Sequence, residues 1–523
     1  MTHLCVPIYV HTPEQAKRDA AVAAENGADL VEFRIDTFTD AERLKQLLTA
    51  CVLPCVVTCR SAEEGGRGEL SDEERLAVLD LPGMDCARYV DVELATFRKL
   101  PNPAAVGERR LILSSHDFQG RPDRLYNILA EQNASPADVT KVVWTARTVR
   151  DNLEAFEILM TRQKPTIALC MGEAGLLSRV LAKKFGAFLT FASLAEGAGT
   201  APGQVTIAEM KRLYRWDAIR PETKVYGVVG SPVGHSMSPA IHNAGFERVG
   251  WDGVYVPLLV NEGYESFKAF MESFLAFGPL HLSGLSVTIP HKENALRYLK
   301  EKGAEVDELA ERIGALNTIV IAREGEAPSG PRLRGFSTDY AAILDSITSA
   351  LGITREGLKG YRVAVLGAGG TGRTAVAALA QYGATVVVYN RTRGKADALA
   401  AEFNGLTGKV VAADWAKLCD SCCQIYVNTT SVGMSPRVDE SPFGDAPPEL
   451  GSGHLVFEAI YNPMETRLLK YARERGAKTV GGVEMFVRQA AGQFEAWTGR
   501  PAPAGLMREV VEGRLSPSPG RAG

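Results

Sequence analysis

The chain has 523 residues, with 58 Lys or Arg against 62 Asp or Glu, and therefore a formal net charge of −4 with histidine neutral. An apolar fraction of 46% with 23% charged residues excludes whole-chain disorder, a collagen-like repeat and a disulfide scaffold. The slight acidity without a long Lys/Arg run excludes non-specific nucleic-acid binding, so we expect small-molecule ligands.

The start of the chain and its cysteines bear on location and metals. Residues 1–10 lack a basic segment followed by a long apolar stretch, and no window reaches about 18 consecutive apolar residues, which predicts a cytoplasmic protein without a membrane span. Nine cysteines lie mostly in apolar runs, which favours buried thiols over disulfides. The single CxxC pattern, Cys419 to Cys422, has no second pair or nearby histidine, so we expect no metal.

The first part of the chain alternates short β-rich runs with helix-like segments such as 12–26 and 122–132. The β-rich runs are 4–10, 28–35, 53–58, 88–93, 110–115, 140–144, 166–170 and 188–192. Eight strand-then-helix units in about 215 residues predict a closed parallel (β/α)8 barrel, the TIM-barrel fold, at residues 1–220. The chemistry of such a barrel lies at the C-terminal ends of its strands.

The rest of the chain predicts a two-part α/β fold. A break at 214–223 precedes a new strand at 225–229, and we expect a substrate-binding domain at 221–350. A Gly-bounded connector then leads into a nucleotide-binding Rossmann domain at 355–481, from which a helix at about 482–500 returns to the substrate domain. The Ser-Pro-rich residues 514–523 are expected to form a flexible tail.

Charged residues recur at the predicted barrel strand ends. Strand alternation places Glu32 and Arg34 on one face, either as part of a site or as a structural ion pair. Other strands add further polar residues, namely Arg60, Glu93, His116 and Lys141. Several such residues converging on one barrel predict a site at its mouth.

Lys141 is flanked by apolar residues, and burial there favours a neutral, nucleophilic amine over an ammonium. A lone strand lysine is usually a solvated end residue, but His116 on the neighbouring strand changes the interpretation. An amine that forms a Schiff base and a histidine that moves protons are the pair needed for proton abstraction next to a carbonyl followed by elimination. Arginines suit a substrate carboxylate because their planar fork binds both oxygens.

Six motifs occur in order along this half: Glu32-x-Arg34-x-Asp36, Arg60 before Gly-Gly, Ser-x-His116-Asp-Phe, the strand lysine Lys141, Met171-Gly172 with Ser178-Arg179, and Phe-Ala-Ser-Leu with Thr200-Ala-Pro-Gly-Gln204. Residues 1–215 thereby resemble type I 3-dehydroquinate dehydratase. The resemblance implies that Lys141 forms an imine with the substrate ketone, that His116 moves the C2 proton, and that Glu93 positions the histidine. It further implies substrate binding by Glu32, Arg34, Arg60, Arg179, Thr200 and Gln204, with threonine at 200 where the family more often has serine.

Polar residues also gather at strand ends of the second half. Ser236 and Ser238 precede a helical segment, where serines are either helix caps or ligands for a substrate oxygen. Lys292 follows Pro290 at a helix start, and Asn317 and Asp339 come after strands. An Asp–Lys pair is a plausible proton relay to a carbonyl that is being reduced.

A glycine-rich turn between a strand and a helix, Gly367-Ala-Gly369-Gly370-Thr-Gly372, is the dinucleotide-binding pattern. Its glycines permit a tight turn, close approach of a pyrophosphate and packing of helix on strand. The next strand ends in Asn390-Arg391-Thr392, where an NAD enzyme carries an acid. Arginine at this position suits a 2′-phosphate, so the sequence predicts NADP.

Further motifs accompany these: Thr288-x-Pro-x-Lys292, Gly-Ala-x-Asn317-Thr, Thr338-Asp339, Asn428-Thr-Thr-Ser-Val-Gly-Met, Tyr461-x-Pro and Gly482…Met485…Gln489. With all of them, residues 224–500 are similar to shikimate dehydrogenase. The resemblance implies that Lys292 and Asp339 assist proton transfer and that substrate is held by Ser236, Ser238, Thr288, Asn317, Tyr461, Gln489 and Gln493. It implies an NADP site formed by Gly367, Ala368, Gly369, Gly370, Gly372, Asn390, Arg391, Thr392, Lys395, Thr430 and Met434. Lys395 stands where the family often has arginine, which weakens the expected preference for NADP.

The two resemblances fit one reaction sequence, because dehydration of 3-dehydroquinate gives 3-dehydroshikimate, which the second activity reduces to shikimate. We therefore expect a bifunctional lyase and NADP-dependent oxidoreductase of the shikimate pathway. Two alternatives stay open: a second half that acts on quinate, and a non-catalytic metabolite sensor. The chemical residues Lys141, His116, Lys292 and Asp339 are all present, which disfavours the sensor. The oligomeric state does not follow from the sequence.

Overall fold

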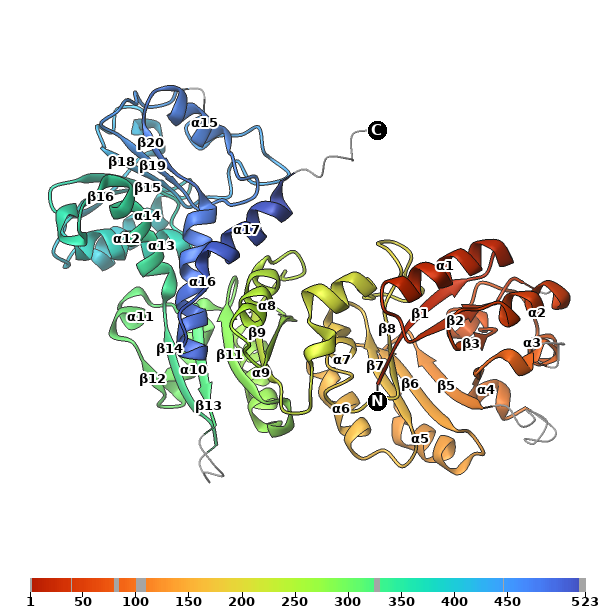
Figure 1. Ribbon diagram of the computed structural model, residues 1–523. Helices are drawn as coiled ribbons and strands as arrows, with labels where there is room; N and C mark the ends of the chain where they lie inside the picture. Colours follow the sequence, from red (N-terminus) through yellow and green to blue (C-terminus); the bar gives the residue numbers. More distant parts are fainter. Residues whose placement is uncertain are drawn as a thin grey trace. The chain divides into compact units, whose positions relative to one another are not determined.

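The computed structural model describes residues 2–38, 40–79, 84–99, 110–323, 330–444 and 446–516. Its chain forms two compact units: residues 1–225, 252–261 and 269–282 make the first, and residues 226–251, 262–268 and 283–523 make the second. Figure 1 shows their helices and strands. None of the helices in the described ranges combines the length and apolarity that a membrane crossing requires.

The first unit contains the predicted barrel. Its strands are β1 (His3–Tyr9), β2 (Leu30–Arg34), β3 (Cys55–Thr58), β4 (Tyr89–Glu93), β5 (Leu111–Asp117), β6 (Val139–Thr145), β7 (Thr166–Met171) and β8 (Leu189–Phe191). They run parallel in the order β7-β6-β5-β4-β3-β2-β1-β8. The amide of Phe188, just before β8, donates to the Thr166 carbonyl of β7 at 2.8 Å and brings the two ends of this order together.

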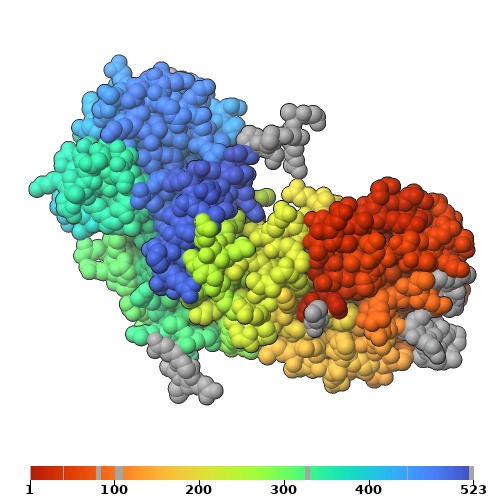
Figure 2. All heavy atoms as spheres, viewed as in Figure 1, coloured from red at the N-terminus to blue at the C-terminus, as the bar shows by residue number. Residues whose placement is uncertain are grey.

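Helices follow the strands on the outside of this sheet. They are α1 (Pro13–Glu25), α2 (Ala41–Thr49), α3 (Asp72–Leu79), α4 (Leu94–Phe97), α5 (Leu125–Ala134), α6 (Asp151–Met160) and α7 (Leu176–Val180). Helix α1 begins where Thr12 accepts from the amide of Gln15, and its alanines Ala16, Ala20 and Ala23 form one buried stripe. In the space-filling view the red segment that contains α1 and α2 is one closely packed surface (Figure 2).

Side-chain alternation divides the barrel interior into layers. An apolar layer takes one residue from each strand near its start: Cys5, Leu30, Val56, Tyr89, Ile112, Val139, Ile167 and Leu189. Two residues further along, five strands carry a buried polar side chain: Glu32, Thr58, Asp91, Ser114 and Lys141. Because alternate residues share a face, the apolar layer lies directly below this polar one and excludes water from beneath it.

A mixed sheet follows the barrel in the chain, and most of its strands belong to the second unit. Its strands are β9 (Lys224–Gly230), β10 (Gly253–Leu259), β11 (Leu282–Val287), β12 (Glu305–Val306), β13 (Thr318–Ala322) and β14 (Arg332–Phe336), in the order β10-β9-β11-β13-β14-β12. The associated helices are α8 (Ser238–Arg248), α9 (Tyr264–Ala276), α10 (Lys292–Glu301), α11 (Glu308–Ile313) and α12 (Thr338–Leu351). Strand β13 pairs antiparallel with both β11 and β14.

A second, all-parallel sheet follows in the chain. Its strands are β15 (Arg362–Leu366), β16 (Thr385–Tyr389), β17 (Val410–Ala413), β18 (Ile425–Asn428), β19 (Leu455–Glu458) and β20 (Lys478–Val480), with helices α13 (Gly370–Gln381), α14 (Arg393–Phe403) and α15 (Arg467–Glu474). Its order β17-β16-β15-β18-β19-β20 is that of a dinucleotide-binding fold, whose strand order reverses between β15 and β18. Ligands bind at that reversal, outside the carboxyl ends of the strands.

Two C-terminal helices complete the second unit. Helix α16 (Gly482–Thr498) packs against α12, α8 and β13 of the mixed-sheet part (Figure 1), and α17 (Ala504–Leu515) packs on α8. The flexible tail predicted from residue 514 begins inside α17, so this start is wrong by two residues; its last residues, 517–523, lie outside the described ones. The other predicted domain boundaries stay predictions.

Candidate active sites

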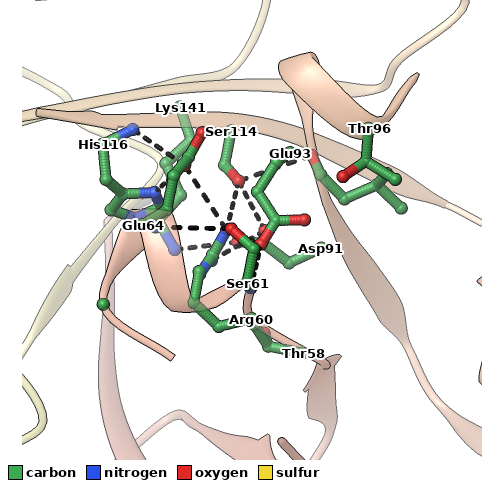
Figure 3. A network of polar contacts seen from close by, with 12 residues as sticks. Thr58, Arg60, Ser61, Glu64, Asp91, Glu93, Thr96, Ser114, His116 and Lys141 are labelled. Carbon is green, nitrogen blue, oxygen red and sulfur yellow. Dashed lines mark hydrogen bonds and ion pairs between the residues drawn. The ribbon is translucent and has the colours of Figure 1, made fainter. Parts of the chain in front are cut away.

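The first candidate site is a pocket at the carboxyl ends of the barrel strands. The residues that line it are Glu32, Arg34, Arg60, Glu64, Gly65, His116, Phe118, Lys141, Val143, Leu169, Met171, Arg179, Phe191, Thr200, Ala201 and Gln204. All residues that the sequence indicated for this half line the pocket except Glu93. Figure 3 shows the polar network at the pocket floor.

Lys141 extends from β6 into this network and is 3% exposed. Its Nζ lies 2.8 Å from Asp91 Oδ2 and 3.6 Å from Glu32 Oε1. Two carboxylates therefore face the amine, a feature that the sequence argument from apolar burial did not include. The amine must hand a proton to a neighbour before it attacks a carbonyl, and Glu32 is the facing carboxylate that no arginine pairs with in the described structure.

His116 has a carboxylate partner, but it is Glu64. The ring Nδ1 lies 2.8 Å from Glu64 Oε2, which also accepts the His116 amide at 3.0 Å. Burial, with Arg60, Lys141 and Arg34, lowers the pKa of His116 well below its ordinary value. Burial also raises the pKa of Glu64 to about 7, although the positive charge of Arg60 opposes this. The imidazole is therefore neutral near pH 7, and Glu64 is the member of the pair that titrates there.

Glu93 does not contact the histidine, and its expected positioning of His116 is wrong in this structure. Its Oε1 accepts the Ser61 amide at 2.8 Å and its Oε2 pairs with Arg75 at 2.8 Å. Because Ser61 begins the turn that carries Glu64, Glu93 fixes that turn instead. The prediction failed because the glutamate that pairs with the ring lies in a loop, where strand alternation gives no indication of direction.

Arg60 is held by the network below the pocket. It donates to Ser114 Oγ at 2.7 Å and pairs with Asp91 at 2.8 Å. Burial opposes its charge, but Asp91, Glu93 and Glu64 outweigh burial and raise the pKa of Arg60. In turn, burial opposes ionisation of Asp91, but Arg60 and Lys141 outweigh it and lower the pKa of Asp91 to about 2. Asp91 thus joins the arginine to the lysine.

Arg179 presents an unused cation to the same pocket. It is 1% exposed, its Nη2 donates to the Pro202 carbonyl at 3.4 Å, and its Nε and Nη1 have no hydrogen-bond partner among the described residues. Burial lowers the pKa of its guanidinium to about 10. The nearby Gln204 accepts the Thr200 amide at 2.9 Å and holds the loop that covers this side. An anionic group entering the pocket would satisfy both orphaned nitrogens.

Glu32 and Arg34 occupy the opposite side of the pocket. Glu32 accepts the Thr58 hydroxyl at 2.9 Å, and Arg34 pairs with Asp36 at 2.7 Å. Arg34 lines the pocket, but its ion pair is with Asp36 and not with Glu32, so the structural Glu32–Arg34 pair that the sequence left open does not form.

The second candidate site is a pocket in the second unit. It is lined by Val228, Ser236, Ser238, Ser286, Val287, Thr288, Lys292, Asn317, Asp339, Thr371, Ala459, Tyr461, Gly482, Met485, Phe486, Gln489 and Gln493. These include every residue that the sequence indicated for substrate binding or proton transfer in this half. Lys292 Nζ lies 2.6 Å from Asp339 Oδ2, which is the spacing of a charge-assisted hydrogen bond and of a proton relay.

Buried hydrogen bonds fix the remaining polar side chains of this pocket. Asn317 donates to the Thr338 hydroxyl at 3.0 Å and accepts the Thr338 amide at 2.9 Å. Gln493 of α16 accepts from Ser286 at 2.8 Å and donates to the Asn317 carbonyl at 3.1 Å. Helix α16 from the C-terminal region therefore completes a site whose other polar groups come from the mixed-sheet part, from Thr371 of α13 and from Tyr461 after β19.

The glycine turn after β15 has the geometry that a dinucleotide needs. Gly367 adopts φ of 106°, and a Cβ at Gly372 would lie 2.3 Å from the Gly367 carbonyl oxygen. A Cβ at Gly369 or Gly370 would meet nothing within 4 Å, so open space lies over the backbone at the start of α13. The turn thus fits a pyrophosphate at a helix N-terminus.

The other residues expected at the cofactor lie around this turn. Asn390 accepts the Ala368 amide at 3.2 Å and donates to the Thr392 carbonyl at 2.9 Å. Arg391 and Lys395 are exposed at the start of α14, where charge is available to a phosphate. The Thr430 hydroxyl donates to Asn428 at 2.7 Å, and Met434 is 44% exposed.

Sequence reasoning missed Asp91 as well as Glu64. Asp91 lies two residues before Glu93 in β4, so strand alternation indicated that the two share a face. For metals, no group of three or more His, Cys, Asp or Glu side chains suited to an ion occurs in the part of the chain that the structure describes.

Family models match along most of the chain. Residues 4–221 match type I 3-dehydroquinase, and residues 228–319 match the shikimate dehydrogenase substrate binding domain. Residues 350–432 match shikimate / quinate 5-dehydrogenase, and residues 482–512 match the shikimate 5′-dehydrogenase C-terminal domain.

Similar proteins agree with this division. The chain is 39% identical to a chloroplastic bifunctional 3-dehydroquinate dehydratase/shikimate dehydrogenase of Arabidopsis thaliana, over 97% of this chain and 84% of the relative. An NADP⁺ shikimate dehydrogenase of Caldanaerobacter subterraneus is 36% identical over 56% of this chain and 98% of its own. A solved shikimate dehydrogenase in complex with NADP⁺ covers 56% of this chain and 96% of its own, with 34% identity and a TM-score of 0.50. The cytoplasmic location stays a prediction.

Proposed function

The chain belongs to the family of bifunctional 3-dehydroquinate dehydratase/shikimate dehydrogenases, and from that premise we propose which residues carry out each step. The first unit dehydrates 3-dehydroquinate to 3-dehydroshikimate, and the second reduces this product to shikimate with NADPH. The observation that carries the residue assignment is the barrel pocket, in which a buried amine, an imidazole and an unpaired guanidinium line one cavity.

In the dehydratase, Lys141 attacks the ketone carbon after its proton passes to Glu32, and loss of water gives an imine. The imine makes the C2 hydrogen acidic, and neutral His116 removes it through Nε2. The same imidazolium then protonates the leaving C1 hydroxyl, which departs as water. Hydrolysis of the unsaturated imine releases 3-dehydroshikimate and returns the amine.

Glu64 sets the tautomer that this chemistry requires. As a carboxylate it accepts the Nδ1 proton of His116, which leaves the Nε2 lone pair free for the substrate. Arg179 holds the substrate carboxylate through its two unpartnered nitrogens. Glu32, Arg34, Arg60, Thr200 and Gln204 complete the wall that fixes the ring, as expected from the sequence.

In the dehydrogenase, bound NADPH supplies the hydride to the substrate carbonyl carbon. Lys292, hydrogen-bonded to Asp339, donates the proton that the carbonyl oxygen requires as it gains charge. Ser236, Ser238, Thr288, Asn317, Tyr461, Gln489 and Gln493 hold the hydroxyl and carboxylate groups of the ring. Gly367, Ala368, Gly369, Gly370 and Gly372 would hold the pyrophosphate, and Asn390, Arg391, Thr392 and Lys395 would hold the 2′-phosphate. Thr430 and Met434 would complete the cofactor site.

One experiment tests both assignments together. Purified protein is supplied with 3-dehydroquinate and NADPH, and products are separated and identified by mass spectrometry. We expect shikimate with both reagents and 3-dehydroshikimate when NADPH is withheld. Failure to form 3-dehydroshikimate refutes the first assignment, and its accumulation in the presence of NADPH refutes the second. Oxidation of shikimate and quinate by NADP⁺ in parallel reactions decides the substrate preference of the second unit.

A further inference from the structure

A buried carboxylate lies just behind the dehydrogenase pocket without lining it. Glu458 ends β19, is 0% exposed, and stands opposite Asn428, the last residue of β18. Burial raises its pKa to about 7, although hydrogen bonds from Ile460, Asn428 and Thr466 oppose this. Burial of a carboxylate without a cation beside it costs free energy, so the presence of Glu458 at this position needs an explanation.

The Glu458 carboxylate accepts four hydrogen bonds from the described residues. The Asn428 side-chain amide donates to both oxygens at 2.9 and 3.1 Å, the Ile460 amide to Oε1 at 3.1 Å, and the Thr466 hydroxyl to Oε2 at 3.1 Å. Asn428 belongs to the strand on one side, while Ile460 and Thr466 belong to the loop that follows Glu458 itself. The carboxylate therefore joins two loops.

The first of these loops lies beside the cofactor turn. Asn428 Oδ1 accepts both the amide and the hydroxyl of Thr430, at 3.0 and 2.7 Å. The intervening Thr429 donates its hydroxyl to the Leu366 carbonyl at 2.8 Å, and its Oγ1 would lie 2.8 Å from a Cβ placed at Gly367 or Gly372. Residues 428–430 are thus fixed against the glycine turn by Thr429, while Asn428 holds Thr430 in the same loop.

The second loop forms a wall of the substrate pocket. Ala459 and Tyr461, on either side of Ile460, line the pocket. The Ile460 carbonyl oxygen would lie 2.3 Å from a Cβ at Gly482, so this loop packs directly on the start of α16. Helix α16 contributes Gln489 and Gln493 to the same pocket.

We propose that Glu458 is a positioning residue for hydride transfer, whose carboxylate couples the cofactor loop at 428–430 to the substrate loop at 459–461. The proposal rests on the reduction assigned above to the second unit. A neutral or misplaced group at 458 releases the two loops from each other without removing any group that touches cofactor or substrate. Small misplacements of this kind cost about 10²-fold in rate.

A donor–acceptor exchange between positions 458 and 428 tests the coupling. Glu458→Gln turns one acceptor into a donor that faces the donor of Asn428, and Asn428→Asp alone sets two acceptors against each other. The double variant restores one donor opposite one acceptor and keeps the net charge. Ser346→Ala, which removes a buried hydroxyl without a hydrogen-bond partner in α12, is the matched control.

We expect Glu458→Gln to lower the kcat of reduction by roughly 10- to 100-fold and to weaken calorimetric NADP⁺ binding by about 10-fold, and the double variant to recover most of both losses. Dehydration by the first unit stays at the wild-type rate in every variant. Wild-type kcat and Kd in folded Glu458→Gln overturn the proposal, as does a double variant no better than the single one.

A second pair of variants decides the question if Glu458→Gln does not fold. Thr466→Val removes one donor to Glu458 together with the acceptor that caps α15 at the Leu469 amide, and Thr466→Ser keeps both. We expect Thr466→Val to lose about 3- to 10-fold in kcat and in NADP⁺ affinity relative to Thr466→Ser, since one hydrogen bond to a charged group is removed. Equal values for the pair overturn the proposal. Wild-type protein that binds NADP⁺ but reduces nothing refutes the assigned reaction instead.

Discussion

Replacement of Arg179 by methionine is predicted to stabilise the first unit while it disables the dehydratase. Burial lowers the pKa of this guanidinium to about 10, and the difference from the ordinary arginine value corresponds to about 3 kcal/mol of unfavourable charge burial. Methionine fills similar space without charge and leaves no orphaned donor. Only the long hydrogen bond to the Pro202 carbonyl, at 3.4 Å, is lost with it.

The same substitution, Arg179→Met, is expected to weaken substrate binding. Two charge-assisted hydrogen bonds from Nε and Nη1 to a carboxylate are worth about 3–5 kcal/mol together, so we expect KM for 3-dehydroquinate to rise about 10²- to 10³-fold in Arg179→Met. Recovery of about 2 kcal/mol of the buried-charge cost should raise the Tm of the barrel by about 5 °C.

The assay combines calorimetry with dehydratase kinetics. Loss of dehydratase activity on heating identifies the barrel transition, and absorbance of the enone product gives KM. Arg179→Lys is the matched control, because it keeps a buried charge but lacks the fork; we expect a raised KM without the gain in Tm. A lower Tm together with an unchanged KM in Arg179→Met would refute the reasoning, since the guanidinium would then be satisfied by the protein itself.

Three further substitutions test the other assignments. Lys292→Ala should lower the kcat of reduction by more than about 100-fold and leave dehydration unchanged, and equal reduction rates would remove Lys292 from the proton relay. Arg391→Ala should reduce the ratio of kcat/KM for NADPH over NADH by about 10-fold or more, and an unchanged ratio would reject the 2′-phosphate contact. The raised pKa of Glu64 is about 7, so its carboxylate is present above that pH, and the kcat/KM of the wild-type dehydratase should fall as the pH drops through 7. Glu64→Gln should abolish this acidic fall in kcat/KM. If the fall persists in the variant, another group causes it.

Much of the fold was predictable because β-rich runs and helix-like segments alternate regularly along the barrel. The eight β-rich runs begin and end within two residues of the observed strands. Parallel strands buried on both faces read as apolar runs, and the helices between them expose one side, so local pattern and final structure agree. The glycine turn was equally predictable, since only glycine fits at 372 against the Gly367 carbonyl.

The site was predictable only where its residues lie on strands. Lys141 and His116 occupy strand positions, and alternation indicated their direction. Glu64 lies in a loop whose path depends on Glu93 and Arg75, and no local pattern shows that it reaches the histidine. Asp91 shares the face of Glu93, yet its contact with Lys141 joins residues 50 positions apart and depends on the register of the sheet.

The central claim is that Lys141 becomes covalently attached to a cyclic ketone. Wild-type protein is incubated with 3-dehydroquinate and sodium borohydride, digested, and the peptides are sequenced by mass spectrometry. The account predicts a reduced secondary-amine adduct on Lys141, together with loss of dehydratase activity, and no adduct in Lys141→Ala. Absence of an adduct from the wild-type protein, or its attachment at another lysine, would contradict the account.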